Sequence, residues 1–494
     1  MRRLIKIIRT VVLVLIAAIV ILAGVLGANA LMTKSRQIEV AALPRVAVDI
    51  DAASKRLAEA IRFRTISNFL DPEHSADAFR GMHAFMQASY PAFHAAIKRE
   101  GIGNFGLLYT WEGTDPKAAP IALLAHQDVV PIAPGTEGNW QAPPFDGVIR
   151  DGFIWGRGSW DDKGNLFSIL EAVEQLVREG FRPKRTIYFA FGQDEEVSGQ
   201  RGAKQIAALL ASRGIKLDFV LDEGLLVTEG ILKGIDKPVA LIGVAEKGYV
   251  TLTLNLNTAP GHSSLPPRQS AIGMMSAALA RLEDKQFPAE IRGTAREMFD
   301  TLAPEMNLTN RVVLSNLWLL KPVLQRELEK SASTNAMMRT TTALTIFNAG
   351  NQDNVLPGRA EATVNFRLLP GETEAGVIDH VKRATASDKI EIGPRTGNTE
   401  PPPVTSTGSD SYRALNRTIR EIFPGVVVAP GLMVAATDSR HFTGVTDNIF
   451  RFSPVRATAE DLTRFHGTNE RLGVENYADM IRFYRRLVQN TASP

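Results

Sequence analysis

The chain of 494 residues contains no cysteine. This absence excludes disulfide bonds, cysteine nucleophiles and metal sites built on thiolates. Histidine is also sparse, with 8 residues in the whole chain. Any bound metal ion must therefore be held by carboxylates and a small number of imidazoles, which makes the position of each histidine informative.

A basic excess is missing outside the first 36 residues. Six of the 56 Lys and Arg residues lie in that leader, which has no acid, so the remainder carries 50 basic against 53 acidic side chains. A nucleic-acid-binding domain needs a basic patch on its folded part. We therefore expect no nucleic-acid partner.

The leader holds the longest apolar run of the chain, Val11 to Met32, which follows the basic residues Arg2, Arg3, Lys6 and Arg9. About 20 apolar residues cross a bilayer, and the positively charged end stays in the cytoplasm. We predict that residues 1–36 form a single-pass membrane anchor with the body outside the cytoplasm. Ala28-Asn29-Ala30 fits a signal-peptidase site, so the alternative is a secreted or periplasmic body after cleavage.

The length of the chain exceeds what one hydrophobic core supports, so at least two domains are expected. Residues 121–125, 186–191 and 217–221 are short apolar runs that predict buried strands, and they alternate with helical patterns at 166–179 and 203–213. This alternation is typical of an α/β fold with a mainly parallel sheet.

The pattern changes after residue 247. Residues 249–256 and 360–368 alternate between apolar and polar side chains, and helical patterns cover 268–282 and 372–385. We predict a smaller, ferredoxin-like α+β lid or dimerisation domain inserted at 247–396. The rest would be a tether at 37–52 and a catalytic domain in two parts, 53–246 and 397–494.

Polar residues follow each predicted strand of the large domain. His126 and Asp128 come after the first, Glu195 and Glu196 after the second, and Asp222 and Glu223 after the third. Parallel sheets bind ligands at the carboxyl ends of their strands. Adjacent buried carboxylates cost several kcal/mol unless a cation or a shared proton compensates, and we predict a metal site at this edge.

Five segments in order resemble the co-catalytic di-zinc peptidases, a family that includes the aminoacylases, carboxypeptidase S and the glutamate carboxypeptidases. The resemblance spans about residues 50–490. The segments are Ala125–Pro131, Gly158–Gly164, Asp194–Gly199, Gly261–Ser264 and His466–Glu470.

The resemblance implies two zinc ions per subunit. His126 and Asp222 would hold one ion, Glu196 and His466 the other, and Asp161 would bridge them. Glu223 is the alternative to Asp222.

The resemblance also implies the catalytic groups. Asp128 would orient His126, and Glu195 would act as general base on a metal-bound water. His262 would stabilise the oxyanion, often across a dimer interface, which implies a homodimer through the inserted domain. Asn354 and Arg367 would contact the substrate, since a guanidinium pairs well with a free carboxylate. A loop histidine and a surface arginine are the alternative interpretation.

An enlarged insertion at 285–347 is most similar to the carboxypeptidase S and N-fatty-acyl-amino-acid synthase/hydrolase branch. It could line a site for a long acyl chain or simply add a packed helical layer. We therefore expect a zinc metallocarboxypeptidase that removes a C-terminal amino acid from a peptide or N-acyl amino acid with a free carboxylate. The alternatives are an N-fatty-acyl-amino-acid hydrolase/synthase or aminoacylase, and a membrane-anchored binding protein on an inactive scaffold.

Overall fold

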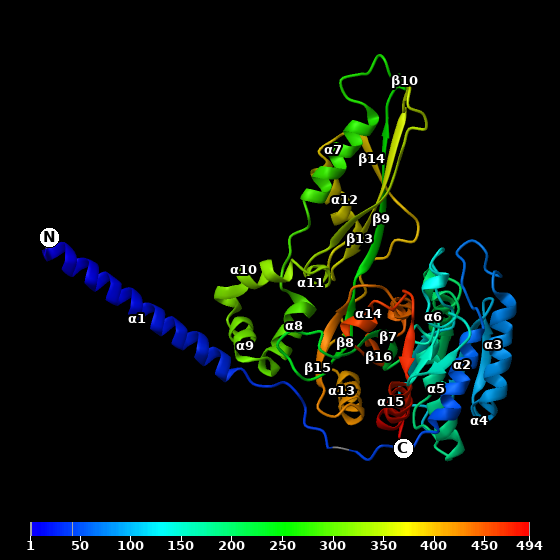
Figure 1. The fold of residues 1–494 in the computed structure, drawn as a ribbon. Helices are drawn as coiled ribbons and strands as arrows, with labels where there is room; N and C mark the ends of the chain where they lie inside the picture. Colours follow the sequence, from blue (N-terminus) through cyan, green and yellow to red (C-terminus); the bar gives the residue numbers. More distant parts are fainter. Residues whose placement is uncertain (1, 42, 494) are drawn as a thin grey trace.

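The computed structural model describes residues 2–41 and 43–493. It has three parts: a long N-terminal helix, a large α/β body, and a slender second domain that projects from the body (Figure 1). The α/β class with an added α+β domain and an N-terminal apolar helix is confirmed.

An eight-stranded sheet forms the centre of the body, with the order β1-β2-β6-β3-β7-β16-β8-β15. The neighbours β6, β3, β7 and β16 run parallel, as do β8 and β15. The edge pairs β1–β2 and β2–β6 and the short β16–β8 contact are antiparallel. The strands are β1 Lys98–Ile102, β2 Gly106–Trp111, β3 Ile121–His126, β6 Ile187–Gly192, β7 Phe219–Thr228, β8 Val239–Glu246, β15 Val427–Met433 and β16 Ile449–Ala457.

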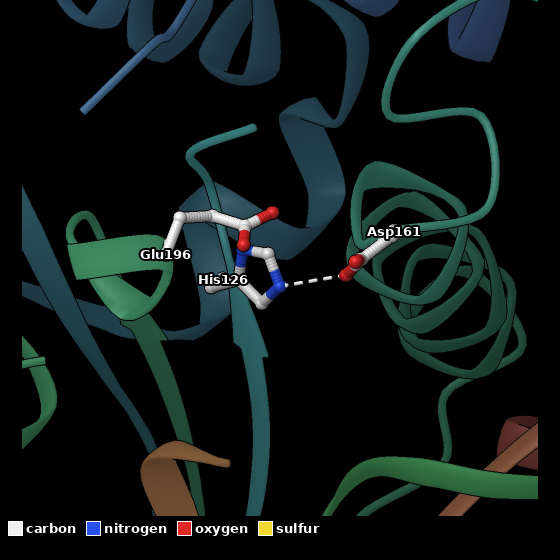
Figure 2. Close-up of side chains that lie close together, drawn as sticks. All are labelled: His126, Asp161 and Glu196. Carbon is white, nitrogen blue, oxygen red and sulfur yellow. Dashed lines mark hydrogen bonds and ion pairs between the residues drawn. The ribbon is translucent and has the colours of Figure 1, made fainter. Parts of the chain in front are cut away.

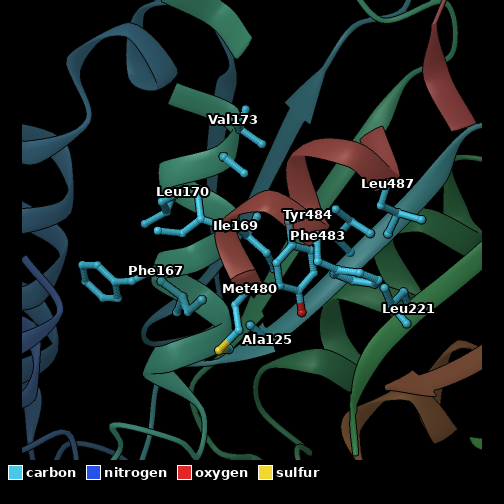
Figure 3. Packing of buried hydrophobic residues seen from close by; sticks show 14 of the residues in the cluster. Ala125, Phe167, Ile169, Leu170, Val173, Leu221, Met480, Phe483, Tyr484 and Leu487 are labelled. Carbon is cyan, nitrogen blue, oxygen red and sulfur yellow. The ribbon is translucent and has the colours of Figure 1, made fainter. Parts of the chain in front are cut away.

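Helices cover both faces of this sheet because its strands are apolar on both sides. Ile121, Leu123 and Ala125 of β3 belong to the main core, whereas Ala122 and Leu124 belong to the core on the opposite face. Helices α5 and α15 pack together on the main core (Figure 3). That side carries α2 Ile50–Arg62, α3 Ala76–Ser89, α4 Pro91–Ala96, α5 Lys163–Arg178, α13 Asp410–Ile422 and α15 Val474–Ala492; the other carries α6 Ala203–Ser212 and the 3-10 helix η4 Asp438–Gly444.

The second domain, called the lid below, contains a four-stranded antiparallel sheet in the order β11-β13-β9-β14. One face of β9 is fully buried, and two helices pack on it. This is the predicted ferredoxin-like arrangement. Its elements are β9 Gly248–Asn257, α7 Ala271–Asp284, β11 Thr341–Ala349, β13 Arg359–Leu368, α12 Glu374–Thr385 and β14 Ile390–Pro394; a short ribbon of β10 Gly261–His262 and β12 Val355–Leu356 lies at the distal tip (Figure 1).

The enlarged insertion forms four helices between α7 and β11. They are α8 Gly293–Leu302, α9 Leu308–Ser315, α10 Leu317–Leu328 and α11 Ala332–Met338. Met298 and Leu302 of α8 share a hydrophobic cluster with Val427 and Ala429 of β15. This layer therefore packs on the edge of the body, although its sequence lies within the range predicted for the lid.

The remaining elements are local. A small sheet is made of β4 Val148–Arg150, β5 Phe153–Trp155 and β17 Arg471–Gly473, and the short helices are η1 Glu137–Asn139, η2 Glu195–Val197, η3 Ala303–Glu305 and α14 Ala459–Leu462. Helix α1, Arg2–Met32, is the one helix within the described ranges that is long and apolar enough to cross a membrane. Its last turns contact α9.

Candidate metal centre

Two neighbouring parallel strands deliver the first site residues to one edge of the sheet. His126 ends β3, and η2, which carries Glu195 and Glu196, follows β6 after two residues. The loop that leads into α5 brings Asp161 to the same edge. One potential ligand atom from each of His126, Asp161 and Glu196 lies within 4.8 Å of the others (Figure 2).

Asp161 lies between two imidazoles. Its Oδ1 is 2.9 Å from Nε2 of His126, and its Oδ2 is 2.7 Å from Nε2 of His466. The same His466 nitrogen is 3.3 Å from Oε2 of Glu196. Four of the five predicted ligands are thus brought together, and each Asp161 oxygen faces a different histidine, as a bridging ligand requires.

Asp128 holds both sides of this cluster. The Nδ1 atom of His126 lies 3.0 Å from the Asp128 carbonyl and 3.3 Å from its carboxylate. That carboxylate also accepts hydrogen bonds from the backbone amides of Glu195 and Glu196, and from the Ser67 hydroxyl. One buried side chain therefore orients a potential ligand and fixes the segment that carries the expected general base.

The position of the fifth predicted ligand, Asp222, is not explained by a strand end. Strand β7 continues to Thr228, so the expected end of this strand at Leu221 is wrong and Asp222 lies inside it. The carboxylate of Asp222 accepts the backbone amides of Glu223 at 2.9 Å and Ser439 at 2.7 Å. Burial and the negative charge of Asp161 raise the pKa of Glu223 well above its usual value. Burial raises the pKa of Asp222 while the charge of His126 acts to lower it, so both acids lie near the cluster. The backbone amides on both oxygens of Asp222 favour Glu223 as the ligand.

The electrostatics of the cluster favour a cation. Burial and the charge of Asp161 raise the pKa of Glu196 to about 7, and burial also raises the pKa of Glu195 well above its usual value. Among the described residues, Oε1 of Glu196 has no hydrogen-bond partner. Buried acids that resist ionisation are stabilised by a nearby divalent ion, and a set of imidazoles and carboxylates suits zinc. The residues therefore fit such an ion.

Glu470 was not predicted as a functional residue, but it shapes the loop that carries Asp161. Its Oε1 accepts the backbone amides of Gly158, Trp160 and Asp161, and its Oε2 accepts a hydrogen bond of 2.5 Å from Arg157. Glu470 follows His466 by four residues, so one short segment both supplies an imidazole and positions Asp161. Only its place in the His466–Glu470 motif could have indicated this role.

The backbone around His466 is unusual. His466 has a φ of 57° in the left-handed region, and Phe465 stacks on its ring at 4.5 Å. A non-glycine residue in this region stores strain, which the surrounding contacts must offset.

At Gly199, which follows η2, a Cβ atom would lie 2.0 Å from Oδ1 of Asp438, so only glycine fits this close approach.

The lid residues divide into two groups. Arg367, on β13, lies over the ring of Tyr249, 4.7 Å from its centroid. Burial lowers the pKa of Arg367, and the charges of Glu246 and Glu195 partly offset this by raising it. Arg367 lies opposite Tyr249, at the end of the lid sheet that adjoins the body. His262 and Asn354 lie instead at the exposed distal tip, where Ser263 donates a hydrogen bond to the Asn354 carbonyl (Figure 1).

The fold and the cluster together define a metal-dependent hydrolase with an α/β catalytic body and a lid. The sequence profile of peptidase family M20/M25/M40 matches residues 122–490, and the chain belongs to this family. It is thus a metal-dependent enzyme that hydrolyses amide bonds.

Relatives and solved structures agree with this assignment. The chain is 44% identical to the probable carboxypeptidase S-like 2 of Dictyostelium discoideum, over 90% of this chain and 85% of that protein. It is also 44% identical to the N-fatty-acyl-amino acid synthase/hydrolase PM20D1 of Xenopus tropicalis, over 87% and 84%. The M20 family metallo-carboxypeptidase Sso-CP2 from Sulfolobus solfataricus shares the fold, with a TM-score of 0.65, 18% identity, and coverage of 89% of this chain and 99% of that one.

Proposed function

We propose that the protein uses two zinc ions to hydrolyse the amide bond that joins an acyl or peptidyl group to a C-terminal amino acid. The observation that carries this proposal is the Asp161 carboxylate, whose two oxygens face His126 and His466. In this proposal Asp161 would bridge the ions, His126 would hold one ion together with Glu223 or Asp222, and Glu196 and His466 would hold the other.

Zinc bound there would supply an acidified water, with a pKa of about 7, and would polarise the scissile carbonyl. Glu195 would take a proton from that water and return it to the leaving nitrogen. Burial, followed by the charges of Asp438 and Glu196, raises the pKa of Glu195, which suits a group that must hold a proton between two steps. Asp128 fixes the positions of His126 and Glu195 relative to each other, because it contacts the imidazole of His126 and the backbone amide of Glu195.

Arg367 gives the substrate its orientation in this proposal. Its guanidinium would pair with the free carboxylate of the C-terminal residue, a charge-assisted contact that neutral substrates lack. The names of the relatives fit two acyl groups, a peptide and a fatty acyl chain. We infer that the two kinds of substrate share their leaving group, an amino acid with a free carboxylate, and differ in the acyl group.

A second copy of the chain would complete the site. His262 and Asn354 lie at the lid tip, away from the cluster of their own chain (Figure 1). The edge strand β11 exposes Leu344, Ile346 and Phe347, which a homodimer would cover. In such a dimer, His262 of each lid would stabilise the oxyanion in the other subunit, and Asn354 would contact the substrate there.

Helix α1 would anchor the enzyme with its body outside the cytoplasm. Its hydropathy and length support a membrane span, and the basic residues at its start support this orientation.

The proposal is tested by a hydrolysis assay on matched amides. The panel contains N-acetyl to N-oleoyl amino acids and dipeptides, each also as its C-terminal carboxamide, with zinc measured on the same sample by mass spectrometry. We expect cleavage of the free acids, little cleavage of the carboxamides and about two zinc ions per chain. Equal cleavage of acids and carboxamides would remove the carboxylate from the recognition, and activity without metal would overturn the mechanism.

A further inference from the structure

The outward face of helix α10 is apolar over its first two turns. Trp318, Leu319 and Val323 are 64%, 40% and 66% exposed, and the exposed Pro322 lies between them. Leu317 is buried on the inner side. A helix on a water-facing surface normally directs polar residues outward, so a continuous apolar face of this kind marks a contact surface.

The start of α10 is tied to the end of α1. Asn316 is fully buried, and its Nδ2 donates to the carbonyl of Leu26 at 3.0 Å while its Oδ1 accepts from Nδ2 of Asn29 at 2.8 Å. Arg311 donates to the carbonyl of Thr33 at 2.6 Å. These hydrogen bonds fix α10 relative to the helix that carries the long apolar run.

The length of α1 gives the depth of this contact. The hydrocarbon core of a bilayer needs about 20 helical residues at 1.5 Å each. Counted from Arg9, the last basic residue before the run, this span ends at about Asn29, the residue bonded to Asn316. Trp318 and Leu319 then lie at the level of the outer headgroups, where tryptophan is preferred. Figure 1 shows α10 on the side of the body from which α1 leaves.

We propose that α10 lies on the outer leaflet of a phospholipid bilayer, with Trp318, Leu319 and Val323 inserted beside the membrane-spanning α1. The proposal rests on the proposed anchoring by α1. The exposed Arg326 on the same helix suits phosphate headgroups. A spanning helix alone would let the body pivot, whereas a second contact fixes its tilt and holds the catalytic edge at a constant height above the bilayer.

Tryptophan fluorescence tests this contact on the full chain. The protein is reconstituted into phosphatidylcholine vesicles with or without bromine on the acyl chains, which quenches tryptophan at the membrane. We expect a lipid-quenched fraction that is lost in Trp318→Phe and retained in the matched control Trp111→Phe, since Trp111 is buried in β2. Leu319→Glu, which keeps Trp318, should lower the quenched fraction by weakening insertion.

Extraction with alkaline carbonate separates this proposal from the anchoring. Protein that resists extraction but shows the same quenching in wild type and Trp318→Phe would overturn the role of α10 and leave the anchor intact. Extracted protein that still shows Trp318-dependent quenching would overturn the anchor and support α10 as a surface contact. Extraction without such quenching would overturn both.

Discussion

The Nε2 atom of His466 lies 2.7 Å from Oδ2 of Asp161, although 305 residues separate the two in the chain. Glu470 explains how this distance is held, because it accepts three backbone amides of the loop that ends at Asp161. The C-terminal segment must therefore dock before the cluster exists.

Glu195→Gln should keep both metal ions and lose turnover. The amide retains the size of the side chain but cannot accept the proton of the attacking water, so kcat should fall about 10²- to 10⁴-fold. The matched variant Glu196→Gln should lose zinc as well as activity, because it changes a proposed ligand. Turnover and zinc content are measured on each protein. Near-normal kcat in Glu195→Gln would assign the base to another group.

Substitution of the two acids on β7 should separate their roles. We expect Glu223→Gln to lower bound zinc by about one ion per chain, because both oxygens of Asp222 already accept backbone amides. Asp222→Asn should keep the zinc but unfold more easily, since its carboxylate accepts two backbone amides. Mass spectrometry of bound metal and thermal unfolding measure the two effects. The reverse result would restore Asp222 as the ligand.

Glu470→Gln should destabilise the fold and weaken zinc binding together. Removing one partner of a buried ion pair costs about 3–5 kcal/mol, and here it leaves Arg157 with its charge uncompensated. Glu475→Gln, an exposed change five residues away, is the control and should be close to wild type. Chemical unfolding and zinc titration measure both properties. A stable variant with normal zinc affinity would contradict the positioning role of Glu470.

Zinc affinity should increase with pH. In the zinc-free protein burial disfavours the charged His466, but hydrogen bonds to Asp161 and Glu196 raise its pKa to about 10. Zinc binds neutral imidazole, so binding must displace this proton, and displacement becomes easier as pH rises from about 6 to about 9. Calorimetry in buffers of different ionisation enthalpy counts the released protons. The His466→Gln variant should release fewer protons when zinc binds. Equal release would show that the proton leaves another group.

Mixed dimers should reveal whether His262 acts across subunits. His262→Ala and Glu195→Gln should each be nearly inactive alone, for different reasons. If each site takes Glu195 from one chain and His262 from the other, a statistical mixture regains about a quarter of wild-type activity. Differently tagged chains, expressed together, allow the hybrid to be purified and assayed. An inactive hybrid would confine His262 to its own subunit, and a His262→Ala homodimer with full activity would remove His262 from catalysis.

The sequence predicted the elements whose signals are local. The apolar runs at 121–125 and 186–191 became β3 and β6, and the alternation at 249–256 became β9 with one buried face. His126, Asp161, Glu196 and His466 converge because parallel strands and their flanking loops meet at one edge. The predicted division of the chain into 53–246, 247–396 and 397–494 stays a prediction.

Other features depend on contacts that composition does not encode. The choice between Asp222 and Glu223 depends on the continuation of β7 past Leu221 and on the backbone amide of Ser439, which donates to Asp222. The helices α8–α11 are amphipathic, so their sequence could not tell whether their apolar sides meet the lid or β15. The sequence around Glu470 does not indicate that its carboxylate accepts three backbone amides.

The bonds between Asn316 and the end of α1 have a practical consequence for making a soluble form. A protein trimmed to begin after Thr33 would lose both α1 partners of Asn316 and the carbonyl that Arg311 contacts. The trimmed molecule would then carry a loosened α9–α10 corner with its apolar side chains open to water. Such a preparation would be prone to self-association, and replacing Trp318 and Val323 with polar residues would be the first remedy to try.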